Sequence, residues 1–358
     1  MPLMDDVSTQ SSSHPTVSVV MTVRNGEQWL DESLSSLLNQ TYTGHMELSV
    51  YNDGSTDKTV EILKVWSFRL EERHISVVLN GHNNDSPKGV GHGRNEAILQ
   101  SRGRYLCFLD ADDIMAPERI ELQLKMAETH PNTLTGSCFE RLPADSTPRY
   151  TAWCCGLSQQ QLYTQAYTAF GPSIIQPTWF CERAVFDKAG PFSIAGKGTP
   201  EDLLFFYHHL ELGGKLLKVD RPLLVYRYHN DCESFNVNRW TIWDARVKAI
   251  VNHVISKWEQ FTIWNAGKEG RRLYRSLCHS DQQKVVAFCD VDVKKIHKGF
   301  YIYEESETVP KPKVPIIHFT EARPPLLICV KWGLTGGGFE ENLASLNLVE
   351  GRDYYLFS

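Results

Sequence analysis

Residues 105–119 read YLCFLDADDIMAPER, and the rest of the chain can be understood from this stretch. Its apolar run is followed at once by three carboxylates, Asp110, Asp112 and Asp113. Carboxylates this close repel one another and lose hydration when buried, so such a cluster indicates a bound cation or a hydrogen-bonded turn. The simpler interpretation is a strand, an Asp-rich turn and a helix that opens at residues 117–118. The spacing alone leaves both interpretations open.

The composition sets limits on the class of protein. The chain has 358 residues and 42% hydrophobic content, enough for two domains with cores of their own. Its 37 Lys and Arg against 43 Asp and Glu give a net charge of -6, which argues against a general polyanion binder but permits a local basic face. The nine cysteines include no CxxC pair, a pattern typical of reduced core thiols.

The N-terminal residues carry no targeting pattern. The first 16 residues are polar and contain no Arg or Lys, unlike a signal or transit peptide. No run reaches the roughly 18 apolar residues of a membrane helix. We therefore expect a soluble, cytoplasmic protein with no membrane contact and a short disordered tail over residues 1–16.

Strands and helices alternate before the opening stretch. The run VSVVMTV at 17–23 is typical of a strand buried on both faces of a parallel sheet. Further strands are predicted at 47–51 and 75–79, and helices at 27–40, around residues 62–66 and, after a glycine-rich loop, at 94–101. The alternation predicts a doubly wound α/β sheet, in which the strand ends along one edge form the ligand crevice.

Five blocks of sequence then identify a family. The first 230 or so residues resemble a family-two glycosyltransferase of the GT-A fold, because five blocks occur in that family's order and spacing: VSVVMTVRNGEQWLDESLSSLLNQTY (17–42), ELSVYNDGSTDKT (47–59), GVGHGRNEAI (89–98), YLCFLDADDIMAPERI (105–120) and PEDLLFF (200–206). The resemblance implies that Thr22 and Asp53 hold the donor uridine and that Arg94 lies near the nucleotide. It also implies that Asp112 binds a divalent cation, with Asp110 near the donor ribose or a metal-bound water.

The chemistry of such a donor agrees with these roles. A nucleotide sugar leaves as a diphosphate, and a hard cation held by carboxylates neutralises the charge that develops on it, so Mn²⁺ or Mg²⁺ is expected. Two of the residues also have simpler interpretations. Asp53 in Asn-Asp-Gly is a typical turn residue, and Arg94 could be a solvated helix residue.

The segment TPEDL at 199–203 is the second chemical site. Thr199 as N-cap, Pro200 at the first helical position and two acids in the first turn form a good helix start, so a structural role alone is credible. The family uses the second acid of this pair, here Asp202, as the general base toward the acceptor hydroxyl. Such a base implies inversion, so that an α-linked donor gives a β-linked product.

Between and after these blocks the sequence says less. A strand at 223–228 ends in YRYH, and His229 is either structural or a metal ligand beside Asp110 and Asp112. Short strands are predicted at 136–138 and 177–181, and a loop over the site at 143–151. Trp179 and Phe180 either form the floor of an acceptor pocket or fill core, and the core interpretation is favoured.

The C-terminal part has a second α/β pattern. After a connecting helix, a strand at 261–264, a glycine-rich turn, a helix at 271–277 and a strand at 284–289 resemble a dinucleotide-binding unit whose first glycine is replaced by Asn265. A structural or acceptor-binding module is preferred to NAD binding. Further strands are predicted at 314–319, 326–331 and 354–357. The expected domains are a tail (1–16), a GT-A domain (17–240), a connecting helix (241–258) and a Rossmann-like domain (259–358).

The tail segments extend the resemblance to the whole chain. With GRRLYRSL (270–277), KVVAFCDVD (284–292) and ICVKWGLTGGGFEENL (328–343), the chain resembles transferases that galactosylate queuosine in tRNA. This implies UDP-galactose as donor and queuosine at the wobble position of tyrosine tRNA as acceptor. Transfer of GlcNAc or another sugar to a non-tRNA acceptor, or an inactive RNA-binding scaffold, are the alternatives. A basic cluster predicts the tRNA contact: Lys268, Arg271, Arg272 and Arg275.

Overall fold

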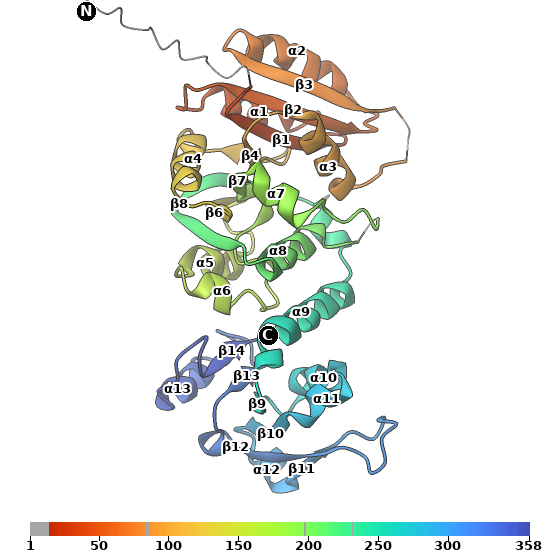
Figure 1. The fold of residues 1–358 in the computed structure, drawn as a ribbon, viewed down its shortest axis with the longest axis vertical. Helices are drawn as coiled ribbons and strands as arrows, with labels where there is room; N and C mark the ends of the chain where they lie inside the picture. Colours follow the sequence, from red (N-terminus) through yellow and green to blue (C-terminus); the bar gives the residue numbers. More distant parts are fainter. Residues whose placement is uncertain (1–13, 84–85, 197, 231) are drawn as a thin grey trace, which may run out of the picture. The chain divides into compact units, whose positions relative to one another are not determined.

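The computed structural model describes residues 14–83, 86–196, 198–230 and 232–358 (Figure 1). The chain divides into two compact units. Unit 1 comprises Met1–Cys155, Ile174–Lys197 and Leu212–Cys232, and unit 2 comprises Gly156–Ser173, Gly198–Glu211 and Glu233–Ser358. The predicted tail falls, up to residue 13, outside the described residues. None of the described helices has the length and apolar character needed to cross a membrane.

Unit 1 is built on an eight-stranded sheet in the order β3-β2-β1-β4-β7-β6-β8-β5. Its strands are β1 (Val17–Val23), β2 (Met46–Asp53), β3 (Ile75–His82), β4 (Tyr105–Phe108), β5 (Ile114–Met115), β6 (Thr133–Leu142), β7 (Phe180–Glu182) and β8 (Lys215–Arg227). Strands β1 to β4 pair in parallel with one another, and β6 pairs in parallel with β8. In contrast, β7 runs antiparallel to β4 and β6, and β5 runs antiparallel to β8. The predicted doubly wound α/β sheet is therefore confirmed as a mixed sheet.

The helices of this part of the chain begin later or earlier than the sequence predicted. They are α1 (Leu30–Leu38), α2 (Thr59–Glu71), α3 (Val90–Gln100), α4 (Arg119–Thr129), α5 (Pro148–Gly156) and α7 (Arg183–Ala189), with a 3-10 turn η1 (Gln176–Thr178). The glycine-rich stretch predicted as a loop is the first turn of α3. Packing requires a glycine at position 93 of this helix, since a Cβ there would lie 2.0 Å from Thr22 Oγ1. The predicted loop at 143–151 is also wrong in part, because α5 begins at Pro148.

The core of unit 1 lies between the sheet and its helices. Strand β1 is buried along most of its length, as its unbroken apolar run predicted. Helix α1 contributes Leu30, Leu34 and Leu37, each 0% exposed, and burial of one such side chain stabilises the fold by about 1.5–3 kcal/mol. Trp179 and Phe180 are also 0% exposed, which confirms that both fill core.

Unit 2 contains a six-stranded sheet in the order β11-β12-β10-β9-β13-β14. The strands are β9 (Phe261–Trp264), β10 (Val285–Asp290), β11 (Phe300–Ile302), β12 (Lys313–His318), β13 (Leu326–Ile328) and β14 (Tyr354–Leu356). All neighbours are parallel except β11 and β12. This is a Rossmann-like arrangement around a central β9, with strands close to the predicted ranges.

The helices of unit 2 come from three parts of the chain. They are α6 (Gln161–Thr164), α8 (Glu201–Glu211), α9 (Arg239–His253), α10 (Lys268–Ser276), α11 (His279–Gln283), α12 (Val293–Lys298) and α13 (Gly338–Ser345), with 3-10 turns η2 (Glu233–Asn236), η3 (Ile255–Lys257) and η4 (Phe319–Glu321). The predicted connecting helix ends at His253, and η3 follows it. Buried Arg246 of α9 donates to the backbone oxygens of Tyr167 and Phe357, which ties residues 156–173 to the C-terminal strand.

Candidate active site

The acidic turn after β4 is the centre of the site in unit 1. The strand ends at Phe108, and the Asp113 N–H donates to the Asp110 backbone oxygen at 3.1 Å, which closes a turn. Carboxylate oxygens of Asp110, Asp112 and Asp113 all lie within 4.8 Å of one another. The hydrogen-bonded turn is therefore confirmed, whereas a cation bound by the converging carboxylates stays a prediction.

Asp113 is the buried member of this cluster. It is 1% exposed, its Oδ1 accepts the Arg227 N–H at 3.0 Å, and its Oδ2 has no hydrogen-bond partner among the described residues. Burial, reinforced by the charges of Asp112 and Asp110, raises the pKa of Asp113 well above its ordinary value. The pKa of Asp112 is also raised, by burial and by Asp110, against the opposing effect of His229. An excess of negative charge of this kind fits a divalent cation.

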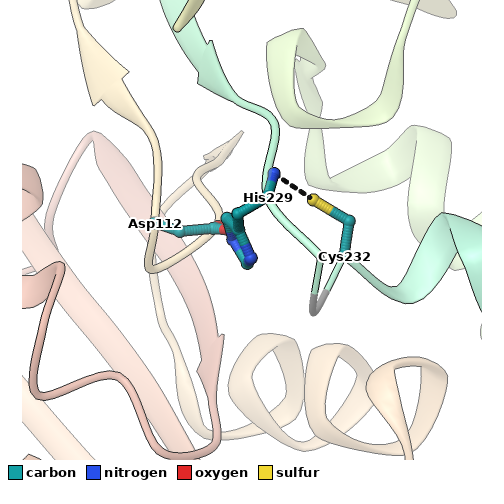
Figure 2. Close-up of side chains that lie close together, drawn as sticks. All are labelled: Asp112, His229 and Cys232. Atoms are coloured by element: carbon teal, nitrogen blue, oxygen red, sulfur yellow. Dashed lines mark hydrogen bonds and ion pairs between the residues drawn. The ribbon is translucent and has the colours of Figure 1, made fainter. Parts of the chain in front are cut away.

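His229 lies directly against Asp112. Strand β8 ends at Arg227, and two residues later His229 Nε2 is 2.8 Å from Asp112 Oδ2 (Figure 2). The His229 backbone N–H donates to Cys232 Sγ at 3.3 Å, so the thiol shapes the turn that carries the imidazole. Ligand atoms of Asp112, His229 and Cys232 lie within 4.8 Å of one another. The structure thus brings His229 to the acidic cluster, and its role as a metal ligand stays a prediction.

Two residues that were not predicted to belong to the site, Trp29 and Arg227, pack beside His229. The Trp29 ring stacks on the His229 ring with centroids 5.2 Å apart. The Arg227 guanidinium lies 4.8 Å from the Trp29 ring and pairs with Glu32. The available signal was an aromatic residue just after the first strand and an arginine just before His229, and neither type alone identifies a stack.

Helix α3 contacts the acidic turn through Arg94 and the end of β1 through Gly93. Arg94 is 6% exposed, and its Nη2 lies 3.1 Å from Asp110 Oδ1. A solvated helix arginine is therefore excluded, and Arg94 holds the first carboxylate of the acidic turn. Thr22 at the end of β1 packs against Gly93 of the same helix, with no room for a larger residue there.

Asp53 ends β2 and is 4% exposed. Its carboxylate accepts the backbone N–H groups of Lys88 and Gly89, both at 2.9 Å, and contacts His82 Nε2 at 2.8 Å. These bonds fix the chain as it enters α3. The structural role of Asp53 is thus visible, while its contact with uridine stays a prediction.

Asp202 belongs to unit 2, in the first turn of α8. The helix begins at Glu201, one residue after the predicted first helical position at Pro200, and Asp202 Oδ1 accepts the Leu203 N–H at 2.7 Å. The side chain is half-buried. A role as general base remains a prediction.

The basic residues proposed to contact tRNA differ in their surroundings. Lys268 and Arg275 are exposed on α10. Arg272 pairs with Glu269 at 3.0 Å, whereas the Arg271 guanidinium lies 5.1 Å from the Tyr301 ring. The exposed pair is therefore the better target for a test of phosphate contacts.

The glycine-rich turn of unit 2 is occupied by its own side chains. Asn265 has φ 118°, its Oδ1 accepts the Gly267 N–H at 2.7 Å, and its Nδ2 donates to the Cys329 oxygen at 2.8 Å. Asp290 accepts the Ala266 N–H and contacts Lys295 Nζ, both at 2.9 Å. Two backbone donors of this turn are thus already used, and the preference for a structural or acceptor-binding module over NAD binding stays a prediction.

Comparison with known proteins agrees with this geometry. Residues 18–188 match the model of glycosyl transferase family 2. An uncharacterized glycosyltransferase of Haemophilus influenzae is 39% identical over 127 residues, covering 35% of this chain and 37% of that protein. The putative teichuronic acid biosynthesis glycosyltransferase TuaG of Bacillus subtilis is 25% identical over 228 residues, 63% of this chain and 83% of TuaG. The chain spans 19% to 44% of the length of the four uncharacterized glycosyltransferases that it matches first.

Solved structures show the same fold. TarS 1-349 of S. aureus in complex with UDP-GlcNAc superposes with a TM-score of 0.52 at 18% identity, covering 74% of this chain and 71% of that one. The mannosyltransferase PcManGT of Pyrobaculum calidifontis, in complex with GDP-Man and Mn²⁺, gives a TM-score of 0.50 at 17% identity, with coverage of 69% and 64%. The α/β fold predicted from the sequence, a GT-A domain followed by a further sheet, is confirmed.

Proposed function

We propose that the chain is an inverting, metal-dependent glycosyltransferase. It transfers galactose from UDP-galactose to queuosine at the wobble position of tyrosine tRNA and forms β-galactosylqueuosine. One observation carries the catalytic part of this proposal. Three carboxylates and His229 converge where β4 and β8 end. The three carboxylates lie within the residues that match glycosyl transferase family 2.

The side chains at the acidic turn fit a hard cation. Asp112 and His229 would hold Mn²⁺ or Mg²⁺, and the carboxylate excess around buried Asp113 supports this choice. When bound, the cation neutralises charge on the diphosphate leaving group. Arg94 keeps Asp110 in place at 3.1 Å, so that this carboxylate keeps a fixed orientation.

The remaining roles belong to side chains that orient the donor or move a proton. Thr22 and Asp53, at the ends of β1 and β2, would bind the uridine, and Asp53 already fixes the entry to α3. Asp202 would accept the proton of the acceptor hydroxyl while the sugar is displaced in one step. A single displacement inverts the anomeric carbon, so an α-linked donor gives a β-linked product.

The tRNA acceptor rests on two arguments. The resemblance to queuosine-tRNA transferases includes the segments of α10 and β10, which lie outside the family 2 domain. An RNA acceptor also needs positive phosphate contacts, which a carboxylate-rich site does not offer. Exposed Lys268 and Arg275 would supply such contacts.

The alternative is transfer of another sugar to a non-tRNA acceptor. It is favoured by WfgD of Escherichia coli, 36% identical over 110 residues (31% of this chain, 40% of WfgD), which is named as a UDP-Glc:alpha-D-GlcNAc-diphosphoundecaprenol beta-1,3-glucosyltransferase. An inactive scaffold agrees less well with the complete acidic cluster and with Asp202 at the start of α8.

Labelled UDP-galactose distinguishes these functions. We expect incorporation of label into tRNA from cells supplied with the queuosine precursor and none into tRNA from deprived cells. The tRNA from deprived cells lacks queuosine, although its sequence and fold are otherwise the same. Equal labelling of both samples would contradict queuosine as acceptor, and labelling of neither would favour a non-tRNA acceptor.

A further inference from the structure

Trp240 is an unusual residue on the surface of unit 2. It lies in the first turn of α9 and is 45% exposed, although large apolar side chains are normally buried. Two guanidinium groups lie against its ring, those of Arg239 and Arg272, each 4.9 Å from the ring centroid. A tryptophan placed in this way keeps part of its aromatic surface exposed beside two cations that lie over the ring.

The surroundings hold this ring in place. Arg272 donates to both carboxylate oxygens of Glu269, at 3.0 and 3.3 Å, and its guanidinium also lies 5.1 Å from Trp243. Trp243 is buried one turn after Trp240, and its Nε1 donates to Ser276 Oγ at 2.9 Å. Helices α9 and α10 are thereby joined at two points, and the exposed ring is preorganised.

The charge around the ring is positive. Lys268 precedes Arg272 by one helical turn, Arg275 is exposed at the end of α10, and Arg239 is exposed beside the ring. Two acids lie nearby in these helices, Glu269, which is paired with Arg272, and exposed Asp244. The N-terminus of α10 adds the positive end of its dipole. A polyanion with planar groups complements this surface.

We propose that Trp240 is a stacking platform for an unpaired base of the acceptor RNA, framed by Arg239 and Arg272. Lys268 and Arg275 contact the flanking phosphates. The inference rests on the proposed RNA acceptor and deepens it by assigning a single-stranded segment to this surface. Aromatic stacking accepts any base, because each base has a π face, and removal of such a ring lowers affinity about 5- to 100-fold.

The test compares two RNAs with the full-length protein. One is a stem–loop with an unpaired loop, and the other is a fully paired duplex of equal length, both followed by fluorescence anisotropy. We expect Trp240→Ala and Trp240→Leu to weaken binding of the stem–loop about 5- to 100-fold and to leave duplex binding unchanged. Trp240→Phe, which keeps a ring, should restore most of the affinity. Trp332→Ala is the matched control, since Trp332 is 50% exposed in the same unit.

Salt dependence separates stacking from phosphate contact. Trp240→Leu should leave the slope of log affinity against log salt unchanged, whereas Lys268→Gln and Arg275→Gln should each reduce it by about 1. Equal loss with the duplex, or unchanged affinity of Trp240→Leu for the stem–loop, would overturn the inference. Failure of the wild-type protein to bind either RNA while it still hydrolyses UDP-galactose would instead refute the proposed acceptor.

Discussion

Replacement of Asp112 by alanine should separate activity from stability in unit 1. The substitution removes a carboxylate that faces His229 at 2.8 Å and that lies beside two other acids, so attraction and repulsion are lost together. We expect the free energy of unfolding without metal to change by less than about 1 kcal/mol, because the side chains of Asp112 and His229 are both partly exposed. Sugar transfer should fall by about 10³-fold, which corresponds to about 4 kcal/mol of lost leaving-group stabilisation.

The shift in melting temperature on addition of Mn²⁺ reports cation binding at this site independently of sugar transfer. At about 100 times its dissociation constant, the cation should stabilise the wild-type protein by about 2.7 kcal/mol, or about 5–10 °C for a domain of this size. Asp112→Ala should lose this shift, and Asp187→Ala, which changes an exposed acid of α7, should keep it. Wild-type transfer and a full Mn²⁺ shift in Asp112→Ala would refute the assigned cation site.

Three further predictions concern other parts of the chain. Asp202→Asn should bind UDP normally and turn over about 10²-fold more slowly, whereas a lower melting temperature with a wild-type rate would identify a helix cap. A hydrogen bond from the Cys138 thiol lowers the pKa of Cys155 to about 6, so Cys155 should be alkylated fully at pH 7 and slowly below pH 6, with Cys138→Ala removing the difference. Because this pKa is depressed, its stabilisation should be present above the unfolded pKa and lost as pH falls through about 6. Gly270→Ala would place a Cβ 1.9 Å from a backbone oxygen and should lower the free energy of unfolding by about 1–3 kcal/mol, measured by chemical denaturation. Gly338→Ala is the control, because the space around Gly338 is open and no such loss is expected.

The strands could be predicted because their sequences allow few alternatives. The apolar run of β1 and the run FTIW of β9 have the predicted bounds, since burial on both faces requires unbroken apolar residues. Helix α3 was predicted to start late, because glycines normally disfavour helices. Here Gly93 is required by contact with Thr22, a constraint that joins distant parts of the chain and is invisible in local sequence.

The acidic part of the site followed from the same logic. Parallel strands carry their ends to one edge of a sheet, so Asp53 and the carboxylates after β4 were expected along one edge. The bond between Arg94 and Asp110, and the stack of Trp29 on His229, depend on side-chain directions that periodicity does not specify. These contacts required the structure.

The proposed transfer of galactose to queuosine is tested most directly by nucleoside mass spectrometry. Queuosine-modified tyrosine tRNA is incubated with the protein, Mn²⁺ and one UDP-sugar at a time. We expect a hexose to be added to queuosine with UDP-galactose alone, with no product from UDP-glucose or UDP-GlcNAc and none from Asp112→Ala. A β linkage, established by β-galactosidase release, would agree with inversion. Transfer of a different sugar would refute UDP-galactose as the donor, and unmodified queuosine while another acceptor is glycosylated would refute queuosine as the acceptor.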